Sequence, residues 1–179
     1  MLAYRDGDSR AFESLYTRHK APLYRYLVRQ CREPAVAEEL FQDVWMNLIR
    51  ARTRYEVQAR FTTYLYRMAH NRLIDHYRRG RSGVSSLYDD DPDDPLMERI
   101  AGPDAMQPDV QTDRARDVQR LLALLAELPE AQREAFLLRE EAGLTLEQIA
   151  EATGVPPETT KSRLRYAVAK LRQGMETGD

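Results

Sequence analysis

The segment GVPPETTKSRLRYAVAKLR, residues 154–172, gathers basic side chains at helical spacing. It holds five basic residues and one acidic residue, although the whole chain has a formal net charge of -2. Glu158, Lys161, Ser162 and Arg165 follow one another at steps that place them on one side of a helix. Arg and Lys donate to guanine O6 and N7, Glu accepts from cytosine N4, and Ser suits either partner. The spacing therefore predicts a helix that contacts base edges in a DNA major groove.

Further polar side chains accompany this face. Basic residues beside a groove-binding helix suit DNA phosphates. The complete predicted DNA-contacting set of this segment is Glu158, Thr159, Lys161, Ser162, Arg163, Arg165, Lys170 and Arg172. The alternative is that the charges only keep an exposed helix soluble, as most charged runs do. Charge by itself favours that alternative.

The preceding residues favour DNA binding. Thr145 and Gln148 match a capping box at the start of a short helix, LEQIAEAT, and Gly154 supplies a turn. Pro157 suits the first turn of the next helix. A short helix, a turn with Gly and a longer basic helix form the helix-turn-helix pattern. The residues expected to build its shared core are Ile149, Val155, Leu164, Val168 and Leu171.

The first 80 residues predict three amphipathic helices. Asp8 or Ser9 can cap the first, Pro34 suits the start of the second, and the third extends from about Arg60 to Arg79. Their apolar residues recur at steps of three, four and seven, without strict strand alternation. The expected core residues are Phe12, Leu15, Tyr16, Leu23, Tyr24, Leu27, Val28, Val36, Leu40, Val44, Leu48, Phe61, Leu65, Met68, Ala69 and Leu73.

In the second half, helices are expected over about residues 112–127 and 130–141, the latter closed by Gly143. The sequence thus predicts an all-α protein.

Charge and composition divide the chain into three parts. Residues 1–80 hold 15 Lys and Arg against 9 Asp and Glu, whereas residues 81–112 hold 2 against 8. This acidic stretch is rich in Asp, Pro, Gly and Ser and lacks sustained periodicity, which predicts a flexible linker. Two small helical domains, residues 1–80 and 113–179, are expected on either side. The linker is either a solvated spacer or an acidic strand that occupies a basic channel of a partner.

Several function classes find no support in the sequence. Its 179 residues include no apolar run long enough to cross a membrane, and the first twenty are too polar for a signal peptide, so a cytoplasmic protein is expected. Cys31 is the only cysteine, which excludes an internal disulfide. His19, His70 and His76 lack triad or metal-ligand neighbours, and no Gly-rich phosphate loop is present. We therefore predict no enzymatic activity, no cofactor and no metal.

Longer segments of both halves are similar to one protein family. AFESLYTRHKAPLYRYLVRQ, AEELFQDVWMNLIRA and RFTTYLYRMAHNRLIDHYRR resemble sigma regions 2.1, 2.2 and 2.3 to 2.4, and LLALLAELPEAQREAFLLREEAGLTLEQIAEATGVPPETTKSRLRYAVAKLR resembles region 4. The chain thus resembles bacterial sigma-70 family factors of the extracytoplasmic-function type. The resemblance implies a factor that binds core RNA polymerase and directs promoter-specific initiation. In such factors region 4 recognises the promoter -35 element.

The resemblance also assigns roles in the first half. The implied surface for core RNA polymerase consists of Glu39, Gln42, Asp43 and Met46. The implied residues for the non-template strand of the -10 element are Tyr55, Gln58, Arg60, Tyr64, Arg67, Asn71, Arg72, Arg78 and Arg79, and the ring of Tyr66 is a further candidate. Within the loop ARTRYEVQAR, Tyr55 and Gln58 are expected to shape a pocket for one flipped base. The alternative for the aromatic residues of this set is that they pack in the protein core.

The sequence departs from the family pattern at Thr160, a position in the last helix where Val is usual. Its hydroxyl must be hydrogen-bonded or exposed, because a buried unpaired hydroxyl is costly.

The partners implied by the resemblance are core RNA polymerase, promoter DNA and a cognate anti-sigma factor, with no membrane insertion. Two other classes stay open on the sequence alone. A stand-alone helix-turn-helix regulator would bind an operator tightly without polymerase, usually as a dimer. A helical interaction adaptor would show neither the steep salt dependence nor the sequence preference of DNA binding.

Overall fold

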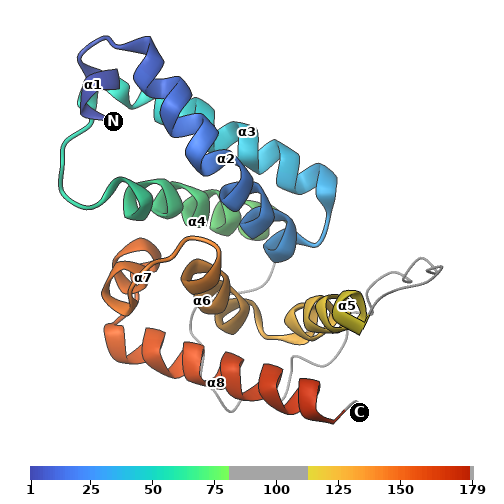
Figure 1. Cartoon of the computed structure of the whole chain (residues 1–179). Helices are drawn as coiled ribbons and strands as arrows, with labels where there is room; N and C mark the ends of the chain where they lie inside the picture. The colour runs from blue at the N-terminus through green and yellow to red at the C-terminus, as the bar shows by residue number, and fades with distance from the viewer. Residues whose placement is uncertain (81–112, 178–179) are drawn as a thin grey trace.

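The residues that the computed structural model of the protein describes, 1–80 and 113–177, form helices joined by turns and loops. The first half contains α1 (Leu2–Arg5), α2 (Ser9–Cys31), α3 (Pro34–Arg50), the short 3-10 helix η1 (Arg52–Arg54) and α4 (Phe61–Gly80). The second half contains α5 (Asp113–Glu127), α6 (Glu130–Glu140), α7 (Leu146–Thr153) and α8 (Pro157–Glu176) (Figure 1). The all-α prediction is confirmed, and the predicted acidic linker lies outside the described residues. None of the described helices has the length and apolar composition to cross a membrane.

Local side-chain signals fix where the helices begin. The Asp8 carboxylate accepts hydrogen bonds from the backbone N–H groups of Arg10 and Ala11, at 2.9 and 3.4 Å, and so caps α2. Thr145 and Gln148 form the predicted capping box of α7: the Gln148 N–H donates to Thr145 Oγ1 at 3.3 Å, and the Thr145 N–H donates to Gln148 Oε1 at 3.0 Å. These predicted starts are confirmed.

Glycine caps α7 and follows α6 in the second half. Gly154 closes α7 with φ of 72°, and Gly143 follows α6 with φ of 64°. Both values lie in the left-handed region, where a Cβ atom would be strained. Gly154 therefore permits the abrupt change of direction from α7 to α8, which begins at Pro157 as predicted.

Most of the predicted core residues of the first half are buried or half-buried. The fully buried members are Leu23 and Leu27 of α2, Leu40, Val44 and Leu48 of α3, and Leu65, Ala69 and Leu73 of α4. Trp45 adds an aromatic cluster at one end, with its ring centroid 4.9 Å from Tyr16 and 5.9 Å from Phe12. The three long helices thus form a bundle that leaves one side of α3 and the η1–α4 loop at the surface.

The core of the second half differs from the prediction on α8. Leu171 is buried as expected, but Val168 is 38% exposed. The residues that α8 buries are Thr160, Arg163, Ala167 and Leu171. Either of two rows of residues on α8 has the spacing of a buried face. One row contains Leu164 and Val168, and the other contains Ala167 and Leu171. The structure buries the second, which packs Ala167 and Leu171 against Leu125 and Leu128.

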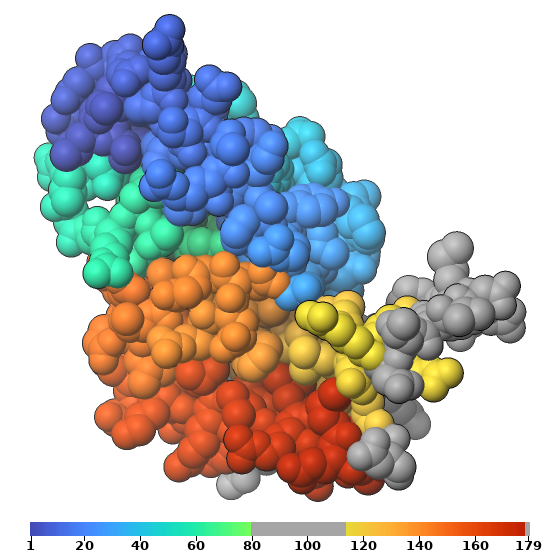
Figure 2. Space-filling view, viewed as in Figure 1, coloured from blue at the N-terminus to red at the C-terminus, as the bar shows by residue number. Residues whose placement is uncertain are grey.

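The two halves pack against each other despite their separation in sequence. Helices α6 and α7 lie along α2 and α4, and the two sets of helices meet along a continuous boundary (Figures 1 and 2). Leu137, Leu138, Leu144, Ile149 and Ala152 of the second half belong to the same buried cluster as the core of the first half. Apolar burial therefore joins regions that the sequence presents as separate.

Candidate nucleic-acid interface

The predicted groove-binding face of α8 is at the surface. Glu158, Lys161 and Arg165 are exposed, whereas Thr159 and Ser162 are half-buried at its edge. The Arg165 guanidinium lies 5.1 Å from the centre of the Tyr166 ring, a cation–π contact that restrains the side chain. Lys170 and Arg172 are exposed on the following turns. The helix thus presents base-contacting and phosphate-contacting types together, as the spacing predicts.

Arg163 does not belong to this face. Only 9% of the residue is exposed, and it lines a small hollow between α6, α7 and α8 together with Glu134 and Thr160. The expected phosphate contact therefore does not fit Arg163, whose side chain lies in the protein interior. The rotation of α8 that exposes Val168 also turns Arg163 inward. The spacing of apolar residues does not predict this orientation of α8, because the two rows that could be buried are adjacent on the helix surface.

Thr160 is buried with only 1% of its surface exposed, and its Oγ1 has no hydrogen-bond partner among the described residues. A hydroxyl in this state costs stability, since it has lost its hydrogen bonds to water. Thr160→Val keeps the branched shape and removes the hydroxyl. We expect the variant to raise the free energy of unfolding by about 1 kcal/mol, measured by urea denaturation. Thr160→Ser should not stabilise the protein, because Ser keeps the hydroxyl and leaves a cavity.

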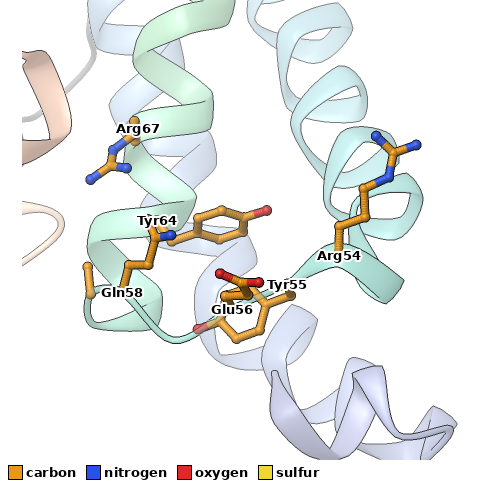
Figure 3. A pocket seen from close by; sticks show the side chains of 7 residues that line it. Arg54, Tyr55, Glu56, Gln58, Tyr64 and Arg67 are labelled. Carbon is orange, nitrogen blue, oxygen red and sulfur yellow. The ribbon is translucent and has the colours of Figure 1, made fainter.

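A pocket opens where the loop after η1 meets the start of α4 (Figure 3). It is lined by Arg54, Tyr55, Glu56, Gln58, Ala59, Tyr64 and Arg67 and encloses about 170 Å³. A cavity of about 150 Å³ is known to bind benzene, so this pocket has room for a planar ring of nucleobase type. The residues predicted for a flipped base, Tyr55 and Gln58, both line it, but Tyr55 is only 6% exposed and is largely a core residue, whereas Gln58 is exposed.

Aromatic and charged groups give the pocket its character. The rings of Tyr55 and Tyr64 meet edge to face, with centroids 5.1 Å apart and an interplanar angle of 71°. Burial raises the pKa of Tyr55, and burial followed by the influence of Tyr55 raises that of Tyr64. Both hydroxyls are therefore protonated at neutral pH and can donate hydrogen bonds. Arg54 and Glu56, which the sequence did not single out, add one charge of each sign at the rim.

The other predicted -10 residues are distributed along α4 and its loop. Gln58, Arg60, Asn71, Arg78 and Arg79 are exposed. Arg72 and Arg67 are half-buried, and each is held by an acidic side chain: Arg72 by Asp75 at 2.9 Å and Arg67 by Glu151 of α7 at 2.7 Å. Tyr66 is only 1% exposed and packs edge to face on Tyr26, so it is a core residue. Its ring cannot stack on a base in this arrangement.

A mixed polar and apolar surface covers the outer side of α3. Glu39 and Gln42 are exposed, Met46 is 46% exposed, and Asp43 is half-buried. Ile49, one turn beyond Met46, is 39% exposed and extends the apolar part of this surface. Ile49 was not among the residues predicted for this surface, although residues three positions apart on a helix lie on the same side.

Comparison with known proteins relates both halves to one family. The sigma-70 region 2 family matches residues 15–83, and the sigma-70 region 4 family matches residues 118–171. The RNA polymerase sigma factor CarQ of Myxococcus xanthus is 32% identical over 173 residues, which are 97% of this chain and 94% of that protein. The extracytoplasmic-function (ECF) sigma factor RpoE of Cereibacter sphaeroides is 35% identical, over 98% of this chain and 92% of that protein. The chain is an ECF sigma factor of the sigma-70 family.

Solved structures extend the likeness of this sigma factor to the fold. RpoE of Bartonella quintana, in complex with the anti-sigma factor NepR, superimposes with a TM-score of 0.69 at 23% identity, over 95% of this chain and 99% of that one. CnrH, in complex with the cytosolic domain of CnrY, gives a TM-score of 0.68 at 19% identity, over 99% of this chain and 97% of that one. At these identities the likeness concerns the fold. Region 2 thus corresponds to α2–α4 and region 4 to α5–α8 of this sigma factor.

Proposed function

We propose that this sigma factor binds core RNA polymerase through the outer surface of α3 and contacts a promoter at two separated places. Lys161, Arg165 and Glu158 of α8 contact base edges of the -35 element, with Lys170 and Arg172 on phosphates. The pocket at the start of α4 holds one unstacked base of the -10 non-template strand. Exposed Arg78 and Arg79 attract the backbone of that strand.

The pocket is the observation that carries the proposal. A helix-turn-helix occurs in many DNA-binding proteins, whereas a base-sized pocket with two tyrosines and two arginines on a second helical domain suits capture of a single strand. Aromatic rings bind unstacked bases, and guanidinium groups bind the backbone. Binding one base out of the stack stabilises an opened duplex without nucleotide hydrolysis.

The α3 surface supports the polymerase contact by its composition. Protein interfaces commonly combine an apolar centre with a polar rim. Met46 and Ile49 provide exposed apolar side chains, and Glu39 and Asp43 provide negative charge beside them. In this proposal the chain supplies no catalysis, because the polymerase carries the nucleotidyl transfer. The protein acts where the polymerase does, in the cytoplasm.

A cognate anti-sigma factor is part of the same proposal. One structure of similar fold contains a sigma factor bound to the anti-sigma factor NepR, and another contains CnrH bound to the cytosolic domain of CnrY. We expect the anti-sigma partner of this chain to cover the α3 surface, since Met46 and Ile49 expose two apolar side chains within one turn of that helix.

Run-off transcription on fragmented genomic DNA tests the function directly. Core RNA polymerase alone is compared with core plus the purified chain, and transcript starts are mapped. We expect discrete new starts that share a pair of upstream sequence elements. No new starts with an active core and a folded, inhibitor-free chain would contradict the proposal and favour a stand-alone regulator or an adaptor.

Tyr64→Ala should weaken capture of the -10 strand. Removing one ring from the pocket lowers affinity for the single strand by about 1 kcal/mol, or about fivefold, because Tyr55 still lines the site. The measurement is binding of a labelled -10 non-template oligonucleotide to the holoenzyme. Tyr64→Phe is the matched control, since it keeps the ring and should retain most of the affinity. Equal losses in both variants would assign the effect to the hydroxyl instead of stacking.

A further inference from the structure

The contact between the two halves contains a buried polar cluster in addition to its apolar part. The Glu134 carboxylate of α6, on a residue only 1% exposed, accepts a hydrogen bond from the Tyr26 hydroxyl of α2 at 2.7 Å and lies 2.8 Å from His70 Nδ1 of α4. Burial raises the pKa of Glu134, but the neighbouring His70 and the hydrogen bonds from His70 and Tyr26 outweigh it and hold the pKa below its usual value. The cluster thus joins a charged group of region 4 to two residues of region 2.

A second polar contact lies beside it. Arg133 of α6 is 2% exposed and donates from its guanidinium to the backbone carbonyl and the side-chain oxygen of Gln30, at 3.2 and 3.3 Å. Gln30 Nε2 donates in return to the Glu130 carbonyl at 3.2 Å. Arg133 also donates from Nη1 to the Leu128 carbonyl of its own half, at 3.1 Å, so its guanidinium links the end of α5 to α2.

Ion pairs surround the buried contacts. Glu141, at the end of α6, accepts from Arg25 of α2 at 2.7 Å and also from Arg29 one turn later. On the other side, Glu151 of α7 accepts from Arg67 of α4 at 2.7 Å. Every one of these pairs joins region 2 to region 4 and places the acidic residue on region 4. Region 4 therefore offers carboxylates to a basic surface of region 2.

The Arg67 pair connects this contact with the proposed -10 site. Arg67 lines the pocket at the start of α4, and its guanidinium is held by a carboxylate in the manner in which it would hold a phosphate. Helix α7 also packs against α4. By contrast, Lys161 and Arg165 on α8 stay exposed. The packed arrangement thus occupies part of the proposed single-strand site and leaves the proposed -35 face open.

We propose that the packing of α6 and α7 on α2 and α4 is an autoinhibitory contact, in which region 4 carboxylates occupy the region 2 arginines until the two domains separate. That the contact keeps single-stranded DNA away from region 2, which we call the masking, rests on the proposed function. That the two domains stay packed together until they separate, which we call the closure, does not. Separation of the domains would expose the apolar part of the contact to water, which opposes opening, whereas water can replace its hydrogen bonds and ion pairs. Separation exposes Arg67 and the α4 surface together.

Charge reversal at Glu141 tests the closure. Glu141→Arg sets a third positive charge against Arg25 and Arg29, yet it suits the end of α6, where the helix dipole favours a cation. Glu140→Arg is the matched control, because it makes the same change of charge at an exposed neighbouring position. Small-angle X-ray scattering of the full chain should show a larger radius of gyration for Glu141→Arg and the wild-type value for Glu140→Arg. An unchanged radius in Glu141→Arg would overturn the proposal.

A double variant with exchanged charges distinguishes loss of the ion pairs from a folding defect. Arg29→Glu combined with Glu141→Arg restores an oppositely charged pair, so the double variant should return toward the wild-type radius. Circular dichroism of each variant should show the wild-type helical content. A double variant that stays expanded would show that these charges do not hold the domains together.

DNA binding by the same variants tests the masking. A labelled mixed-sequence single strand and its duplex serve as probes, measured by anisotropy. If the open form is about a tenth of the wild-type population, Glu141→Arg should bind the single strand about tenfold more tightly than Glu140→Arg. Duplex affinity should be equal in the two variants, since the α8 face is open in both states. An expanded Glu141→Arg with no gain over Glu140→Arg would overturn the masking.

If the proposed function is wrong, the DNA-binding and scattering experiments give a different combination of results. In that case no variant would bind the single strand, while the radius of gyration still separated Glu141→Arg from Glu140→Arg. This result would overturn the masking and support the closure.

Discussion

Asp43→Arg should nearly abolish assembly of the sigma factor with core RNA polymerase. Asp43 lies between exposed Gln42 and Met46 on the outer side of α3 and is half-buried, so its charge is held close to any docked partner. An acidic surface binds a basic one, and reversal places like charges together at a cost of about 2–5 kcal/mol, or more than about 30-fold in affinity. Fluorescence titration of labelled sigma factor with core polymerase measures the loss.

Glu13→Arg is the control for this prediction. Glu13 is exposed on α2, in the same half of the protein, and its reversal makes the same change of net charge. Core affinity should be nearly unchanged in this variant. Equal losses in Asp43→Arg and Glu13→Arg would mean that net charge, and not the α3 surface, governs the interaction.

Arg165→Ala should relax promoter selection at the -35 element. Arg165 is exposed at the centre of the α8 face and restrained by Tyr166, which suits a bidentate contact to guanine. Losing such a contact costs about 1–3 kcal/mol, or about 5- to 150-fold in discrimination against the wrong base. Competition between the preferred promoter and its -35 mutants, with holoenzyme and run-off transcription, measures the ratio.

Lys170→Ala provides the comparison for Arg165→Ala. Lys170 is exposed on the same helix, and its removal deletes the same charge at a proposed phosphate contact. It should weaken binding to all promoters alike and lower the salt dependence by about one unit of slope, with unchanged discrimination. If Arg165→Ala behaved in the same way, Arg165 would be a phosphate contact and base recognition would lie elsewhere on α8.

Much of the helical framework was predictable because its signals are local. The capping box of Thr145 and Gln148, the positive φ of Gly154 and the start of α8 at Pro157 each depend on residues within one turn. The first-half core followed from periodicity, since Leu40, Val44 and Leu48 form a single dominant apolar row. Such features need no knowledge of the neighbouring helices.

The pocket was foreseen only in part. The loop that forms it could be located from the family resemblance, and Tyr55 and Gln58 were named for it. Arg54, Glu56 and Ala59 were not, because their place around the pocket depends on how the segment from η1 to α4 folds. No periodicity exists in such a loop from which a side-chain direction could be derived.

The sequence by itself determined the helices, their ends and the residue types available for nucleic-acid contact, because these depend on interactions within a few residues. Only the tertiary structure decided the rotation of α8, which buries Arg163 and exposes Val168. It alone also decided that Glu134 meets His70 and that Glu151 holds Arg67. These choices depend on packing between helices far apart in the chain, where competing rows of similar spacing are separated only by shape and charge across the contact.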